Sequence, residues 1–366
     1  MDDGAISGSL WVLFLYDIAE EIHLDTLRGI LGAPPPGREP PFRQPAPEYV
    51  QFARPPVIEP LKAPAFLEGE PIGGRVAYYD YGVVSLKLEL PFQGTWDDAV
   101  DLAAHWMNAP ELEQRAAEAM RWHVERAAVA LVKRYEEHLS EDYFIFHIRE
   151  IEGDGGHPVT AARLMASRGD FIAQIVRGER AAFSSAEQAE ILGSRMSYYE
   201  TDLLLVGWSA ALIYDTAEGA APTIQLLEYA NTQLLEFRHY DAVLTDLLTG
   251  VYRSLEKGTG FWARWRLAGE AERLNTIRLE VRELAERVDN SIKFLSDMFA
   301  ARLYRMAAAK IGVPDYRSLV DQKLQSAGEL YGFMMDQFHQ GRAFILELMV
   351  VVILIIELVY LFRGKM

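Results

Sequence analysis

The sequence contains no cysteine. This absence excludes a disulfide framework, thiolate metal sites and a cysteine nucleophile, and it fits a reducing compartment. Common catalytic patterns are missing as well: the chain has no GxGxxG, GxxxxGK[ST] or GxSxG, and its 8 histidines never form HxH, HxxxH or HExxH. The sequence therefore predicts no catalytic residue, no bound cofactor and no metal site.

Basic residues are scarce relative to acidic ones. The chain has 36 Lys and Arg against 53 Asp and Glu, which gives a net charge of −17. Nucleic acids and anionic lipids both favour a basic surface, so direct binding of nucleic acid is not expected. With 366 residues, 50% of them hydrophobic, the chain is long enough for two domains and a sizeable core.

A secretory signal is also missing from the N-terminus. The first residues are acidic, and the apolar run from Leu10 to Tyr16 stops at Asp17. That pattern predicts a strand rather than a signal peptide. We therefore expect the folded part to stay in the compartment where it is made.

Residues 343–362 form the one long hydrophobic run, and they include Glu347 and Glu357. Twenty residues make a helix of about 30 Å, the thickness of a hydrocarbon core, so the run predicts a transmembrane helix. Residues ten apart lie about 80° apart around a helix, which places both glutamates on one half of it. We interpret them as an intramembrane interface with another helix. Protonation, or contact with lipid headgroups, is the alternative.

The orientation follows from the missing signal peptide. A domain of this size does not cross a membrane without one, which predicts a tail anchor with a cytoplasmic head at the bacterial inner membrane. Arg363 and Lys365 beyond the run favour the opposite orientation by the positive-inside rule.

The rest of the chain divides into four segments. Residues 1–31 predict the first strand and helix of a head domain. Residues 32–64 hold eleven of the 17 prolines and predict a surface excursion, either a plain loop or a ligand for a proline-binding groove. Residues 65–216 alternate strand and helix signals, with a capping box at Thr95 and Asp98, and complete an α+β head with a mixed or antiparallel sheet. Residues 222–341 carry apolar stripes at spacings of three and four, which predict a long coiled-coil-like helical stalk.

One stretch of that stalk, residues 226–241, is unusually polar. Each of its polar side chains lies three or four residues, about one helical turn, from another polar side chain. Side chains at that spacing can interact along a helix. They predict a polar seam that fixes the pairing of head and stalk, or of two subunits. The alternative is a salt-bridged face exposed to solvent. The seam residues are Glu228, Asn231, Glu236, Arg238 and Asp241.

Three stretches of the sequence resemble a known family. They are LELMVVVILIIEL (346–358), YYDYGVVSLKLELPF (78–92) and YANTQLLEFRHYD (229–241). They are similar to the required-for-meiotic-nuclear-division and sporulation family, whose members usually end in Leu-Glu-Trp with a second Glu ten residues after the first. Glu347 and Glu357 match that spacing, whereas Leu348 replaces the Trp. The resemblance implies a bacterial-type member with an α+β head, a helical stalk, a C-terminal anchor and self-association, and links eukaryotic relatives to mitochondrial membranes and organelle translation.

These observations favour a non-enzymatic, tail-anchored membrane protein that forms a homo-oligomer and acts as a scaffold or tether for an unknown cytoplasmic protein partner. A second interpretation is a membrane-tethered enzyme acting on nucleotides or nucleic acid. Its site in the head would gather several of Asp80, His147, Arg149, Glu152 and Asp154. A third interpretation, a tether for the translation machinery, rests on the family resemblance alone.

Overall fold

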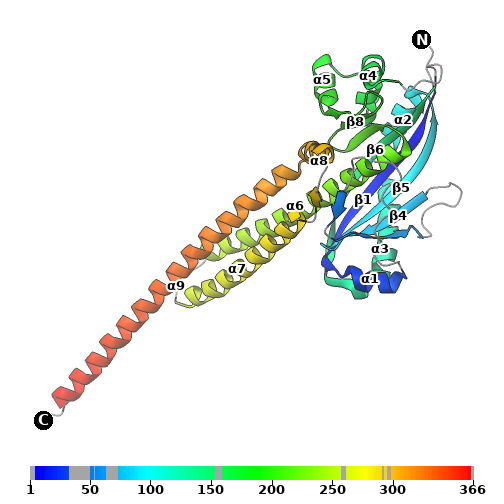
Figure 1. Ribbon diagram of the computed structural model, residues 1–366. Coiled ribbons are helices and arrows are strands. Elements are labelled where there is room, and N and C mark those ends of the chain that lie inside the picture. The colour runs from blue at the N-terminus through cyan, green and yellow to red at the C-terminus, as the bar shows by residue number, and fades with distance from the viewer. Residues whose placement is uncertain are drawn as a thin grey trace. The chain divides into compact units, whose positions relative to one another are not determined.

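Strand β1 (Ile6–Ile22) lies in the middle of an eight-stranded sheet in the computed structural model of the chain (Figure 1). The structure describes residues 5–32, 50–52, 54–62, 73–152, 159–256, 261–290, 292–294 and 298–363. Residues 1–239 and 287–316 form one unit, which contains the sheet, and residues 240–286 and 317–366 form a second.

The sheet is mixed. Its strand order is β3-β4-β5-β1-β6-β9-β8-β7, and every neighbouring pair is antiparallel except β6 and β9. The strands other than β1 are β3 (Val57–Pro60), β4 (Gly73–Tyr78), β5 (Val83–Gly94), β6 (Leu131–Ile151), β7 (Arg195–Met196), β8 (Leu203–Val206) and β9 (Ala210–Tyr214). Although the residues after Leu131 include several good helix formers, β6 begins there and pairs with the end of β1.

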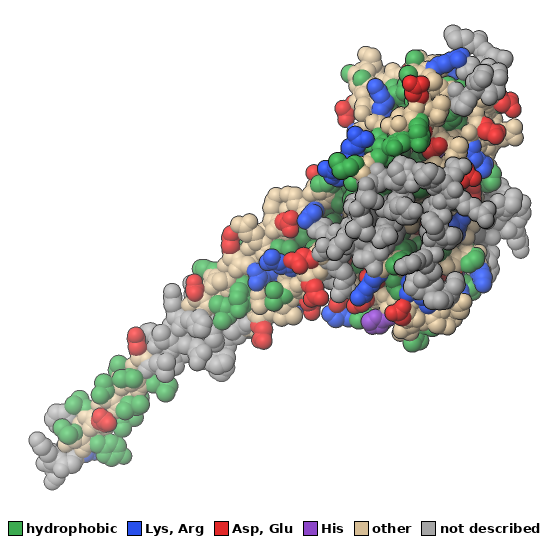
Figure 2. Space-filling model, viewed as in Figure 1, with side chains coloured by type: hydrophobic (Ala, Val, Ile, Leu, Met, Phe, Trp, Pro, Cys, Tyr) green, Lys and Arg blue, Asp and Glu red, His purple; other side chains and the backbone are tan. Residues whose placement is uncertain are grey.

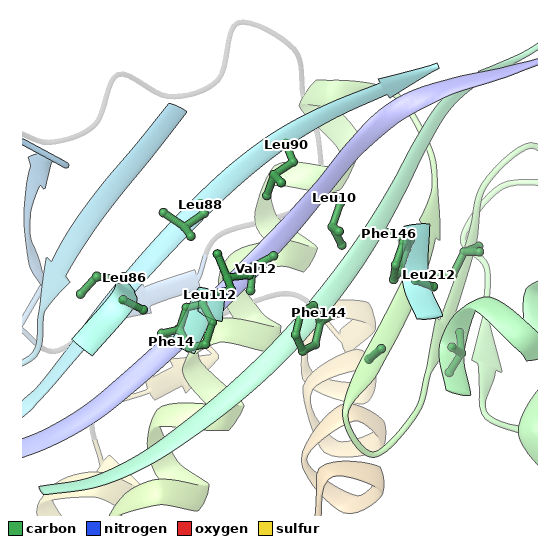
Figure 3. Close-up of a cluster of buried hydrophobic side chains, with 14 of the residues drawn as sticks. Leu10, Val12, Phe14, Leu86, Leu88, Leu90, Leu112, Phe144, Phe146 and Leu212 are labelled. Atoms are coloured by element: carbon green, nitrogen blue, oxygen red, sulfur yellow. The ribbon is translucent and has the colours of Figure 1, made fainter. Parts of the chain in front are cut away.

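Helices cover the sheet because both of its faces carry apolar side chains. On one face, alternate residues of neighbouring strands form the core shown in Figure 3, among them Leu10, Phe14, Leu88 and Phe146. This core also takes side chains from α1 (Leu24–Leu31), α2 (Trp96–Trp106), α3 (Pro110–Ala127), α4 (Ala161–Arg177) and α5 (Ser185–Gly193). The opposite face lies under the first part of α6 (Ala217–Glu256).

Local signals explain where two of these helices begin. Thr95 accepts a hydrogen bond from the Asp98 backbone, and the Asp98 carboxylate accepts one from the Thr95 backbone, so the predicted capping box is confirmed. Pro110 occupies the first turn of α3, where its missing N–H leaves no helical bond unmade.

The second unit contains the remainder of α6, together with most of α7 (Phe261–Asn290) and most of α9 (Val313–Arg363). Leu248, Val251, Leu274 and Met334 are among the residues of its small apolar core. The predicted stalk is therefore not one body, because the chain from residue 222 to residue 239 belongs to the sheet unit.

Strand β10 (Ile292–Phe294), which pairs with β2 (Val50–Phe52), also replaces the helix expected around Ile292. The remaining helix, α8 (Met298–Ile311), belongs to the first unit.

The predicted membrane anchor is wrong. Across the residues that the structure describes, no helix combines the length and the apolar composition that crossing a bilayer needs. Residues 343–362 are the end of α9, and Glu347 and Glu357 are exposed on it. Three further predictions depended on this anchor and are wrong as well. They are the single-span membrane partner, the tail-anchored functions and the inner-membrane location.

Gly82 connects β4 to β5 in a conformation that a side chain would disturb. Its φ is +98°, and a Cβ atom there would lie 1.7 Å from the backbone oxygen of Ala19. We expect Gly82→Ala to lower the free energy of unfolding by about 3 kcal/mol or more, from backbone strain and displacement of β1. Gly29→Ala is the matched control: a Cβ there meets no atom within 4 Å, and alanine should raise the stability of α1 by about 0.5–1 kcal/mol. Urea denaturation measures both, and equal stabilities for the two variants would contradict the assignment.

Candidate functional site

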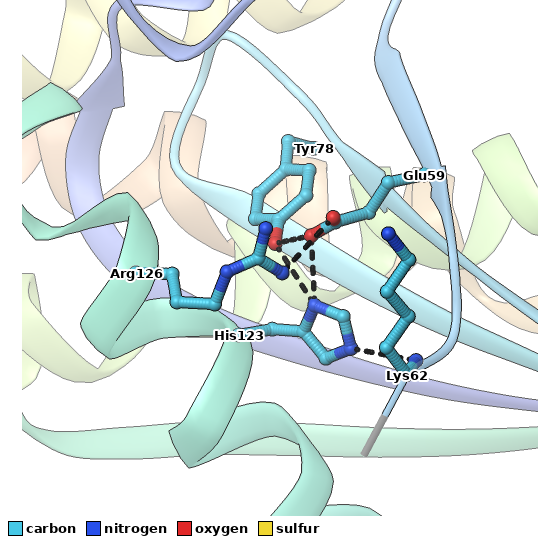
Figure 4. Close-up of polar contacts among 5 residues, drawn as sticks. All are labelled: Glu59, Lys62, Tyr78, His123 and Arg126. Carbon is cyan, nitrogen blue, oxygen red and sulfur yellow. Dashed lines mark hydrogen bonds and ion pairs between the residues drawn. The ribbon is translucent and has the colours of Figure 1, made fainter. Parts of the chain in front are cut away.

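A buried carboxylate on the edge strand β3 organises the first polar cluster, shown in Figure 4. Glu59 is only 6% exposed. Its Oε1 accepts a hydrogen bond from the Tyr78 hydroxyl at 2.8 Å and lies 2.7 Å from His123 Nδ1, and its Oε2 accepts one from Arg126 at 3.1 Å. We call these four residues the Glu59 network; it joins β3 and β4 to α3.

The contacts of His123 define its tautomer. The backbone N–H of Lys62 donates to His123 Nε2 at 3.5 Å, so Nδ1 carries the proton and donates to Glu59. Burial alone raises the pKa of Glu59, but the hydrogen bonds from His123 and Tyr78 and the charge of Arg126 outweigh it and hold that pKa below its ordinary value. Burial, and then the Glu59 charge, raise the pKa of Tyr78. The Glu59 network thus holds an ionised carboxylate whose donors are already in place.

A second polar cluster lies between α6 and the sheet. Five polar residues of α6 are at most 4% exposed, although such side chains are rarely buried without partners. We call them the α6 polar layer: Glu228, Asn231, Thr232, Gln233 and Glu236.

Contacts of this layer fasten α6 to its neighbours. The Glu228 carboxylate accepts hydrogen bonds from the Ser85 hydroxyl at 2.7 Å and from Lys87 Nζ at 2.5 Å, both on β5. Burial, and then the Glu228 charge, raise the pKa of Tyr79, which keeps that hydroxyl neutral. The Tyr304 hydroxyl of α8 donates to the Gln233 side chain. The layer therefore orients α6 on β5 and α8 on α6.

Asp17 of β1 lies at the end of this layer. It is 1% exposed, and its Oδ2 lies 2.8 Å from Nδ1 of His239 on α6. Tyr135 lies within a register irregularity between β1 and β6, and its ring stacks on His239 with centroids 4.6 Å apart. Burial raises the pKa of Asp17, and contact with His239 opposes that rise. Asp17 and His239 together can hold a proton, but α6 covers them.

The predicted seam residues divide between the two units, with Asp241 alone of the five in the second. Glu228 and Glu236 are buried in the first unit, and Asn231 donates to the Leu227 carbonyl of its own helix. Arg238 forms an ion pair with Glu141 of β6. Asp241 belongs to the second unit, where it pairs with Lys323 at 2.5 Å.

The structure separates Asp80 from the other residues proposed for an enzymatic site. The carbonyl of Asp80 accepts from Ile22 at one end of β1, whereas His147 lies opposite Ser9 toward the other end, roughly 40 Å away along the strand. His147 Nε2 lies 3.0 Å from the Asp215 carbonyl oxygen, and Arg149 donates to the Gly8 carbonyl. Glu152 donates its backbone N–H to Ala5, and Asp154 lies outside the described residues.

An open site lies beside the edge strand β7. A cavity of about 680 Å³ is lined by apolar side chains of α4, α5 and β8 and by β7 itself, including Met165, Leu192, Met196 and Leu203. Three alanines of α4 complete one wall, and Arg195 is the charged residue of the lining. We call this cavity the β7 hollow. Its volume lies within the range of ligand pockets, and its lining is mostly apolar.

Aromatic residues follow the β7 hollow in sequence, and their loop is held in place. Tyr198 and Tyr199 are 47% and 65% exposed. The Asp202 carboxylate accepts hydrogen bonds from both of their backbone N–H groups, at 2.8 and 2.6 Å. The Tyr198 ring also contacts Phe299 of α8, with centroids 4.8 Å apart. Figure 2 shows hydrophobic side chains gathered at the surface over β8 and α8. The sequence analysis missed this site; its one local signal is the Tyr-Tyr pair followed by Asp202.

The pH dependence of stability tests the Glu59 network. The folded-state pKa of Glu59 lies below its ordinary value of 4.5, so its stabilisation is present above that value and is lost as the pH falls through the folded-state pKa. We expect Glu59→Gln to lower the free energy of unfolding by about 3 kcal/mol at pH 7 and by progressively less below pH 4.5. Denaturation at several pH values measures this. Glu118→Gln, at an exposed position of α3, controls for general charge effects; a deficit for Glu59→Gln that does not change with pH would contradict the assignment.

A double-mutant cycle tests the α6 polar layer. Lys87→Met leaves the Glu228 carboxylate buried without its cation, which we expect to cost about 3–5 kcal/mol of stability. Adding Glu228→Gln removes that charge and keeps an acceptor for Ser85, so the double variant should recover most of the loss. Urea denaturation measures the stability loss of each single variant and of the double variant. If the losses of Lys87→Met and Glu228→Gln sum to the loss of the double variant, the contact between Lys87 and Glu228 does not position α6.

Comparison with known proteins relates the sheet unit to a protein family. The family model described as "Uncharacterized protein MJ0711, N-terminal domain" matches residues 7–221, which include the sheet and the β7 hollow. A similar protein is the uncharacterized protein MJ0711 of the archaeon Methanocaldococcus jannaschii, 20% identical over 170 residues, which cover 46% of this chain and 52% of that protein.

The chain thus spans about half the length of the curated relative that it matches. No solved structure matches it. The relative is archaeal, so it gives no support to a bacterial inner-membrane protein, and the resemblance to the meiotic-division and sporulation family stays a prediction. Because the match covers more than half of the chain, the protein belongs to the family of the MJ0711 N-terminal domain.

Proposed function

We propose that the first unit is a protein-interaction module that binds an apolar segment of a partner protein in the β7 hollow. The observation that carries this proposal is an open, apolar cavity followed by two exposed tyrosines whose backbone is fixed by Asp202. Aromatic residues, methionine and arginine are enriched at protein interfaces, and all three occur here. A rigid loop loses little conformational entropy on binding, which favours affinity.

The Glu59 network and the α6 polar layer differ from the β7 hollow, and this difference supports the hollow as the binding site. In the Glu59 network and at Glu228, the polar side chains are turned toward one another and lie between secondary-structure elements. Their contacts hold the fold. The β7 hollow presents apolar atoms of Met165 and Leu192 to solvent, and an apolar ligand would release the water there.

Charge indicates the chemistry of the bound segment. The first unit, residues 1–239 and 287–316, holds 40 acidic and 24 basic residues, a net charge of −16, yet the charged residue of the lining is Arg195. Arg195 donates to the Leu192 carbonyl through one nitrogen, and its guanidinium has further donors. We therefore expect a segment with apolar side chains and one carboxylate, carried by a partner whose surface is otherwise basic.

A peptide selection tests the proposal. A random dodecapeptide display library is selected on the full chain, and the consensus peptide is synthesised and titrated by fluorescence anisotropy. Ala166→Trp fills one wall of the hollow and should weaken binding at least tenfold. Ala189→Trp, at an exposed α5 position outside the lining, should leave the affinity unchanged.

Thermal unfolding of both tryptophan variants checks that they stay folded. A library that yields no enriched peptide, or a peptide that binds Ala166→Trp as tightly as the unchanged chain, overturns the interaction module.

A further inference from the structure

β7 is one end of the sheet, and its pairing with β8 fixes where its backbone groups point. Arg195 pairs with Leu205 and Met196 with Leu204, and the N–H of Val206 donates to the Ser194 carbonyl at 3.0 Å. Hydrogen-bonded and non-hydrogen-bonded pairs alternate along an antiparallel ladder. Arg195 therefore occupies a non-hydrogen-bonded position, and its N–H and C=O point away from β8.

The opposite end of the sheet is protected. Edge strand β3 carries Glu59, whose charged side chain points inward, and it ends at Pro60, which has no N–H to offer. Inward-pointing charges and prolines are common guards against the pairing of a foreign strand. In the part of the chain that the structure describes, β7 contains no proline, and no strand pairs with its outer side.

The β7 hollow lies where side chains of an added strand would go. Arg195 and Leu205 are direct partners in the ladder, so their side chains share a face of the sheet. Leu205 belongs to the core that includes Leu164 and Ile172 of α4, and α4 also forms a wall of the hollow. Successive side chains of a strand alternate between faces, so every second residue of an added strand would enter the hollow.

We propose that the partner segment binds as an additional β-strand along the outer edge of β7, with every second side chain in the hollow; this inference rests on the proposed function. The segment is extended, alternates apolar residues at the positions that face α4, and places a carboxylate near Arg195. The main chain of Arg195 exchanges two hydrogen bonds with one residue of the segment. Strand addition of this kind takes affinity from the main chain and specificity from alternate side chains.

An N-methyl scan of the selected peptide tests the binding mode. Each N-methyl group removes one backbone donor and blocks close pairing on that side. At the peptide residue that pairs with Arg195 we expect a loss of about fivefold or more in affinity, and at its two neighbours less than twofold. The scan should therefore show one sensitive position flanked by tolerant ones.

Two variants of the protein give a second readout. Arg195→Pro removes the outward N–H and leaves the β7–β8 hydrogen bonds in place, whereas Arg195→Ala removes only the side chain. We expect the proline variant to bind about fivefold more weakly than the alanine variant at equal thermal stability.

The outcomes separate the two proposals. If Ala166→Trp abolishes binding but the N-methyl scan shows no sensitive position with tolerant neighbours and the Arg195 variants bind equally, strand addition is wrong and the interaction module stands. If selection yields no peptide that depends on the hollow, both fall.

Discussion

The structure of the sheet unit depends on the burial of both faces of β1. Leu10 and Phe14 face the helical core on one side, while Leu13 and Leu15 are fully buried on the side that faces α6. A strand covered on both faces must be apolar nearly throughout, and any polar group on it needs a partner. Asp17 meets this requirement through His239. Displacing α6 would therefore expose apolar side chains and remove the buried contact between Asp17 and His239 at once.

The polar contacts of α6 set its orientation rather than the bulk of its stability. Buried ion pairs such as Glu228 and Lys87 gain little over apolar packing, but they cost several kcal/mol when misaligned, so they select one position of the helix. Through Gln233 and Tyr304 the same helix positions α8, whose Phe299 supports Tyr198 beside the β7 hollow. The geometry of the open site is thus linked to the polar layer by direct contacts.

Local sequence patterns predicted the elements that local interactions stabilise, and failed where distant contacts decide. The apolar run from Leu10 to Tyr16 and the capping box at Thr95 act within a few residues, and both are present in the fold. The segment after Leu131 has helix-forming charged residues, yet Arg134 pairs with Ala19 in the sheet, because strand pairing outweighs propensity. The β7 hollow combines α4, the end of α5 and two strands, and no single stretch of sequence carries that juxtaposition.

Magnitudes indicate which kind of binding the β7 hollow can support. Two main-chain hydrogen bonds contribute about 1 kcal/mol each, so the apolar surface must supply most of the affinity. Covering two tyrosines and the hollow would bury roughly 400 Å² of apolar area, or about 10 kcal/mol at about 25 cal/mol per Å². Association costs about 4–15 kcal/mol in lost freedom, which leaves a net affinity in the micromolar range or weaker. A module of this kind suits a partner that binds and dissociates repeatedly, since weak binding with fast dissociation follows from so small a surface.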